Sequence, residues 1–202
     1  MPYSRPPSPQ AAVERLLAGN QRYIDEHPQA PVSSASRIEL ASGQQPFAVV
    51  VGCSDSRVPV ETIFDQAPGN LFVVRVAGHV ISDEVLASAE YGVAVLGSMI
   101  VLVLGHSACG AVQATLDHLA TGAPLPGHVD RLVEAIAPAV RDCPGVAEAV
   151  NANAAAAAHQ LYERSQILRE AARAGTIRIA AATYDLHSGR VRMLESYVGS
   201  QT

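Results

Sequence analysis

Four runs of apolar, largely β-branched residues constrain most strongly what this chain can fold into. They are FAVVV (residues 47–51), LFVVRVA (71–77), MIVLVLG (99–105) and TIRIAAATYD (176–185). Runs that are apolar throughout, without alternating polar residues, are typical of strands in a parallel sheet that is covered on both faces. A shorter run, RVRMLES, follows the turn signal HSG and is expected to return as an antiparallel edge strand.

In the segments between these runs, apolar residues recur at the spacing of an α-helix. Helices are predicted over residues 11–25, 83–96, 111–120 and 128–140, and over a long alanine-rich segment, 146–174. Strands that alternate with helices predict an α/β fold with a mainly parallel central sheet, here four parallel strands and an antiparallel edge, flanked by helices. A length of 202 residues suits one domain. We therefore expect a single domain over residues 1–202, with a flexible arm (1–10) and an N-terminal helical arm (11–42).

Composition narrows the classes of function. The formal net charge is −5, and the basic residues are all arginines that form no cluster, which argues against a nucleic-acid partner. No apolar run is long enough for a transmembrane helix, and the proline-rich start lacks the apolar core of a signal peptide. Three cysteines, an odd number without framework spacing, favour a reducing compartment and a metal or catalytic role. A cytoplasmic protein without a membrane partner is expected.

Polar residues capable of chemistry follow the first and third apolar runs. The first run leads into GCSDSRV (52–58), and the third ends in GHSACG (105–110). In open α/β sheets, ligands bind beyond the carboxyl ends of the strands. Residues two apart in an extended chain point to the same side, so Cys53, Asp55 and Arg57 are expected to face one spot. His106 and Cys109, three apart at the start of a helix, can turn toward the same spot.

Cys53, His106 and Cys109 form the kind of soft ligand set that zinc favours. Three protein ligands leave the fourth position of a tetrahedral zinc open, as in catalytic sites. Asp55 is near enough in sequence to be the fourth ligand and close the site. Arg57 offers the alternative of a paired hydrogen bond that holds the carboxylate away from the metal. Each signal is weak alone, but together at two sheet ends they favour zinc.

With these motifs, the chain resembles the β-class carbonic anhydrases. The resemblance extends over most of the chain and rests on AVERLLAGNQRY, CSDSRV, FDQAPGNLFVVRVAGHV, EYGVAVLG, GHSACGAV and TYDLHSG. It implies reversible hydration of carbon dioxide to bicarbonate and a proton, by attack of zinc-bound hydroxide. The residues that match the zinc ligands of the family are Cys53, His106 and Cys109, and those that match its catalytic pair are Asp55 and Arg57.

The resemblance also implies a substrate pocket and an oligomer. The residues that match the pocket are Gln44, Phe72 and Tyr91. In the family the pocket lies at a dimer interface that the glutamine crosses, so a homodimer or homotetramer is expected. Members regulated by bicarbonate carry a tryptophan where this chain has Val50, although Arg75 and Tyr184 stand at the other two regulatory positions. The missing tryptophan argues against that regulation.

Two other functions are compatible with the motifs. One is a zinc site of the same kind that acts on carbon disulfide or carbonyl sulfide, which are also small linear molecules. A noncatalytic zinc-binding or redox-sensing module, switched by oxidation of Cys53 to Cys109, is the third hypothesis. Asp55, Arg57 and Gln44 argue against it, because a structural zinc site needs none of them. His79 follows the second apolar run and is expected at the surface or an interface, and Cys143 is taken as incidental.

Overall fold

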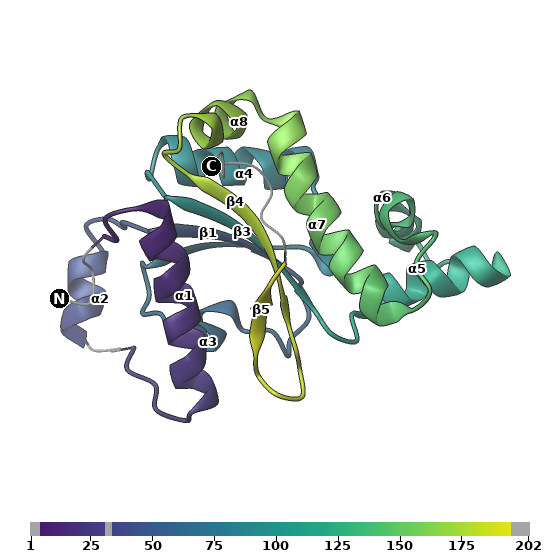
Figure 1. Ribbon diagram of the computed structural model, residues 1–202, viewed down its shortest axis with the longest axis horizontal. Helices are drawn as coiled ribbons and strands as arrows, with labels where there is room; N and C mark the ends of the chain where they lie inside the picture. Colours follow the sequence, from purple (N-terminus) through teal and green to yellow (C-terminus); the bar gives the residue numbers. More distant parts are fainter. Residues whose placement is uncertain (1–4, 31–33, 195–202) are drawn as a thin grey trace.

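The computed structural model describes residues 5–30 and 34–194, and its centre is a five-stranded sheet of order β2-β1-β3-β4-β5 (Figure 1). Four strands run parallel, and β5 pairs antiparallel with β4 at the edge. This confirms the α/β prediction. The strands are β1 (Ala48–Gly52), β2 (Leu71–Arg75), β3 (Ile100–His106), β4 (Arg178–Tyr184) and β5 (Val191–Met193).

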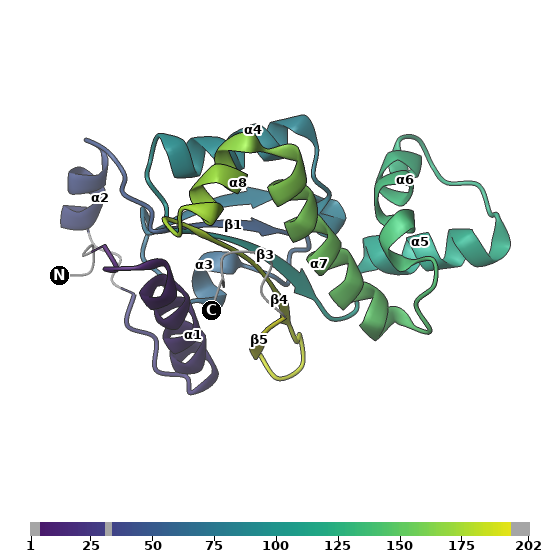
Figure 2. The same cartoon turned by 45° about the horizontal axis from the view of Figure 1, so that its top comes forward.

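Helices cover both faces of the sheet, which explains why its central strands are apolar throughout. Every residue of β1 and β3 is buried. Successive side chains alternate between two core clusters: Val50 packs with the cluster under α1 and α3, whereas Val49 and Val51 pack with the cluster under α4, α7 and α8. The two groups of helices lie on opposite sides of the sheet in Figure 2.

The helices of the described residues follow the predicted segments closely, with additions. They are α1 (Pro9–Ile24), α2 (Ser34–Leu40), α3 (Val60–Ile63), α4 (Asp83–Ala94), α5 (Gly110–Thr121), α6 (Val129–Val140), α7 (Val146–Arg164) and α8 (Gln166–Arg173), with a 3-10 turn, η1 (Ala77–His79). Helix α1 starts two residues earlier than predicted, because the Ser8 side chain caps it by accepting from the Ala11 amide. None of the helices in residues 5–30 and 34–194 is both long and apolar enough to cross a membrane.

The prediction of one helix over residues 146–174 was wrong, because the segment breaks at Ser165. The backbone of Ser165 is extended, with φ −105° and ψ 117°. Its hydroxyl accepts from the Leu168 amide at 3.0 Å and donates to the Glu90 carboxylate of α4 at 2.6 Å. Ser165 therefore caps the start of α8 and fastens it to α4.

The segment that follows α1 is fastened by one buried carboxylate. Asp65 is 5% exposed and accepts from the backbone amides of Gln29 and Ala30 and from the Arg22 side chain. Burial alone would raise the pKa of Asp65, but these donors outweigh it and lower the pKa. The ionised carboxylate holds the chain between α1 and α2 against the end of α3.

The order of the strands creates one crevice. The chain passes from β1 to β2 on one side and then to β3 on the other side of β1. The connections therefore diverge at the carboxyl ends of β1 and β3, where α/β sheets bind ligands. Helices α5 and α6 follow β3 and project beyond α7 at this end (Figure 1). A third apolar cluster, which includes Ile136 and Val140 of α6, lies beneath them.

Candidate metal centre

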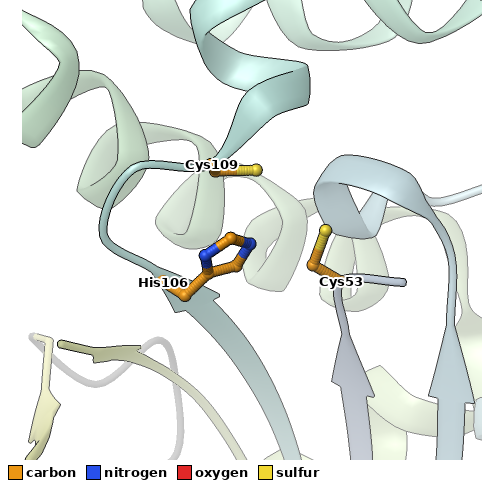
Figure 3. Close-up of side chains that lie close together, drawn as sticks. All are labelled: Cys53, His106 and Cys109. Atoms are coloured by element: carbon orange, nitrogen blue, oxygen red, sulfur yellow. The ribbon is translucent and has the colours of Figure 1, made fainter. Parts of the chain in front are cut away.

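Cys53, His106 and Cys109 come together at the crevice between β1 and β3 (Figure 3). Cys53 follows the last residue of β1, His106 ends β3, and Cys109 stands at the start of α5. One ligand atom from each residue lies within 4.8 Å of the others, and all three residues are buried. Tetrahedral zinc with bonds of about 2.0–2.3 Å would place such atoms about 3.6–3.8 Å apart. The cluster therefore has the dimensions to hold one metal ion.

The imidazole of His106 is oriented as a ligand. Its Nδ1 lies 3.0 Å from the Ser107 carbonyl oxygen, which can only accept, so Nδ1 carries the proton. Its Nε2 is buried and has no hydrogen-bond partner among the described residues. A buried polar atom is normally satisfied. The unsatisfied lone pair of Nε2, beside two thiols, fits a metal ion.

The two thiols influence each other's ionisation. The pKa of Cys53 is lowered by the Cys109 thiol, against the opposing effect of burial, and His106 and the Gly78 amide lower it further. The pKa of Cys109 is raised, because the Cys53 thiolate lies beside it and the site is buried. Ionisation of one thiol therefore opposes ionisation of the other. A divalent ion bound by both sulfurs would offset this repulsion and displace the thiol protons.

Asp55 and Arg57 form a paired contact at the rim of this cluster. Arg57 donates from Nε to Asp55 Oδ1 at 2.9 Å and from Nη2 to Oδ2 at 2.6 Å, and its backbone amide also donates to Oδ1. These donors hold the pKa of Asp55 far below its usual value. Asp55 Oδ2 lies 3.9 Å from His106 Nε2, so the carboxylate borders the position that a metal would take.

Arg75 fixes the loop that carries Cys53 and Asp55. Its guanidinium donates to the carbonyl oxygens of Cys53 at 2.9 Å and of Asp55 at 2.6 Å. The sequence resemblance indicates Arg75 only as a member of the trio of regulatory positions. The other two positions of that trio are also engaged: Val50 is fully buried in the core, and the Tyr184 hydroxyl lies 3.3 Å from that of Tyr23.

The expectation that His79 lies at the surface or an interface was wrong, because its side chain is completely buried within the chain. It lies in η1, directly after Gly78, whose amide donates to Cys53 Sγ at 3.3 Å. The His79 ring contacts the Asn153 side chain of α7 at 3.0 Å. Burial lowers the pKa of His79 to about 4, so the ring is neutral. No local spacing in the sequence connects His79 with Asn153, 74 residues away.

The three residues expected in the substrate pocket do not lie at the metal cluster of the same chain. Phe72 pairs with Val49 near the start of β1, four residues before Cys53, or about 13 Å along an extended strand. Tyr91 of α4 contacts Phe72 with ring centroids 6.0 Å apart and is 48% exposed. Gln44 precedes β1 and is exposed. All three lie toward the amino end of β1.

Comparisons with known proteins identify the family of this chain. A sequence model of the family described as carbonic anhydrase matches residues 48–191. Carbonic anhydrase 2 of Mycobacterium tuberculosis is 42% identical over 199 residues, covering 96% of both chains. The chain therefore belongs to the carbonic anhydrase family, in its β class, and it is a carbonic anhydrase.

Two solved structures share the fold. A Coccomyxa β-carbonic anhydrase in complex with acetazolamide superposes with a TM-score of 0.71 and 25% identity, covering 93% of this chain and 88% of that one. One of two tetrameric β-carbonic anhydrases from Sordaria macrospora gives a TM-score of 0.68 at 23% identity, covering 92% and 94%. The fold of this chain is thus that of β-class enzymes.

Proposed function

We propose that this carbonic anhydrase hydrates carbon dioxide reversibly with a zinc ion held by Cys53, His106 and Cys109. The observation that carries the proposal is the buried, unsatisfied Nε2 of His106 next to two thiols, one of them with a lowered pKa. Two sulfurs and one imidazole nitrogen suit zinc better than calcium or magnesium, which prefer oxygen. A zinc ion there would act as a Lewis acid and make a bound water more acidic.

Asp55 would orient the nucleophile in this proposal. Its carboxylate is ionised at neutral pH, because Arg57 and the backbone amide of residue 57 donate to it. An ionised carboxylate accepts a hydrogen bond and fixes the direction in which the nucleophilic lone pair points. Arg57 would keep Asp55 from taking the fourth metal position, which lies beside His106 Nε2. The pair thus gives the site an open position and an oriented nucleophile.

We propose that Gln44, Phe72 and Tyr91 serve the site of a second copy of the chain, as in a homodimer or a dimer of dimers. The support is their distance along β1 from the metal cluster of their own chain, together with exposed apolar side chains near them. Tyr91 is 48% exposed, and Val95, which directly follows α4 as its C-cap, is 64% exposed. Phe72 and Tyr91 would provide an apolar wall for a small gas, and Gln44 a donor to its oxygen.

Mixing two inactive variants tests the shared pocket. Gln44→Ala should impair the pocket and Cys109→Ser the metal centre, so each variant alone should be nearly inactive. If Gln44 acts across the interface, a mixed dimer contains one site free of both defects. Random association should then restore about a quarter of the wild-type activity. Absence of any restoration, with mixed dimers demonstrated by a tag, would refute the shared pocket.

Metal analysis tests the ligand set. Cys109→Ser should lose most bound zinc, because a neutral hydroxyl replaces a thiolate ligand. Cys143→Ser is a matched control, since Cys143 is the other free cysteine outside the cluster and should not affect zinc content. Equal zinc in both variants would remove Cys109 from the ligand set.

The free state of all three cysteines also supports our proposal that the enzyme works in a reducing cytoplasm.

A further inference from the structure

A polar contact between α7 and η1 lies beneath the metal cluster and has no part in the chemistry proposed above. Asn153 is 5% exposed and His79 is fully buried, and the two side chains meet at 3.0 Å. We propose that Asn153 is a positioning residue: through His79 and Gly78 it holds the backbone amide that donates to the Cys53 sulfur, and so tunes the metal centre. This proposal rests on the metal centre proposed above.

The backbone of η1 adopts a costly conformation that requires external support. Gly78 has φ 64°, and His79, which has a side chain, has φ 46°. The left-handed region is uncommon for residues other than glycine, and it persists where the surroundings hold it in place. This turn brings the Gly78 amide to 3.3 Å from Cys53 Sγ. The strain therefore coincides with a contact to a proposed metal ligand.

Asn153 is the side chain that supports this turn from outside it. Its Nδ2 donates to the Gly78 carbonyl oxygen at 3.0 Å and lies 3.0 Å from His79 Nε2. The carbonyl can only accept, so the amide nitrogen of Asn153 must face both groups, and His79 Nε2 is the acceptor. Residues 78 and 79 are thus fixed by one side-chain amide from a different element. Helix packing alone would not select this peptide orientation.

The Gly78 amide affects the metal centre through the sulfur. A hydrogen bond to a thiolate withdraws electron density from the sulfur, so the sulfur donates less to a bound metal. A metal held at this site would then stay more electropositive and would acidify a bound water more strongly. The amide also fixes the position of the Cys53 sulfur, which would keep this ligand in place for the metal. Groups that orient metal ligands in this way typically contribute about 10–100-fold to metal affinity or activity.

Cobalt substitution measures this effect directly on the sulfur. Asn153→Ala should shift the thiolate-to-cobalt absorption band, weaken zinc binding about 10-fold or more in a chelator competition, and move the midpoint of the pH–rate profile upward. Asn151→Ala is the matched control. Asn151 lies two residues before Asn153 on the same helix, and its replacement removes a 2.7 Å hydrogen bond from the Thr183 hydroxyl. The control should leave the band unchanged and zinc affinity within about threefold.

An unchanged cobalt band and zinc affinity in Asn153→Ala would overturn the proposal. If Asn153→Ala does not fold, two variants of its contact residue His79 test the same proposal. His79→Asn should keep zinc affinity within about threefold, because asparagine tolerates the left-handed region and retains a polar group. His79→Ala should lose about tenfold or more. Equal affinities in the two His79 variants would refute the proposal, whereas a wild-type chain that binds neither cobalt nor zinc would refute the metal centre itself.

Discussion

Replacing Gly78 with alanine is expected to destabilise the protein by about 2–5 kcal/mol. A left-handed φ costs a residue with a side chain about 1–2 kcal/mol, and the φ of Gly78 is 64°. The new methyl group would also lie 2.6 Å from Ile136 Cδ1 and 3.1 Å from Ala111 Cβ. Ile136 is fully buried, so relieving this contact must disturb the core, at about 1–3 kcal/mol.

A double-mutant cycle separates the two costs. Ile136→Val removes the atom that the new methyl group would meet, and alone should cost about 0.5–1.5 kcal/mol. In the double variant the clash is relieved, so the total loss should be smaller than the sum of the two single losses by about 1 kcal/mol. The left-handed backbone cost should remain.

Urea unfolding followed by circular dichroism suits this test, because the chain has no tryptophan to report by fluorescence. Protein and zinc concentrations are kept the same for all four proteins. A Gly78→Ala variant within about 0.5 kcal/mol of the wild type would show that the turn is not constrained as described. Strict additivity would show that Ile136 is not the obstacle.

Two further predictions concern carboxylates. Arg57→Ala should keep its metal and lose most carbon dioxide hydration, because Asp55, 3.9 Å from His106 Nε2, is then free to occupy the fourth metal position; near-normal activity with full metal content would contradict this. Asp65→Asn should cost about 1–3 kcal/mol of stability at neutral pH. The pKa of Asp65 is lowered by folding, so its contribution is complete above the unfolded value of about 3.9 and is lost as pH falls through the folded value. Unfolding measured at decreasing pH should therefore show the gap between wild type and Asp65→Asn closing in acid, and a constant gap would be contrary evidence.

The sheet and the cluster were predictable because both follow from short-range rules. Continuous apolar runs indicate strands covered on two faces, and the carboxyl ends of adjacent parallel strands must meet. Cys53 follows one such strand, whereas His106 ends the other and Cys109 comes three residues later. The proximity of these three residues could therefore be predicted without knowledge of side-chain packing. The antiparallel β5 was similarly indicated by the turn before it.

Other features depend on contacts between distant segments. Ser165 interrupts a segment of unbroken helical composition, and its partner Glu90 belongs to another helix. His79 is buried because Asn153, in an alanine-rich helix, supplies its partner. The register of α7 against η1 sets that contact, and composition does not encode it. Gln44 depends on a second copy in our proposal, which lies beyond the packing of one chain.

The central claim is that a three-ligand zinc centre in this chain hydrates carbon dioxide. Metal analysis combined with stopped-flow hydration from about pH 6 to about pH 9 tests it most directly. We predict about one zinc per chain, hydration activity that rises from neutral into mildly alkaline pH, and loss of activity on chelation that added zinc restores. A purified, folded protein that hydrates carbon dioxide at full rate without metal, or that binds zinc fully and shows no hydration at any of these pH values, would contradict the claim.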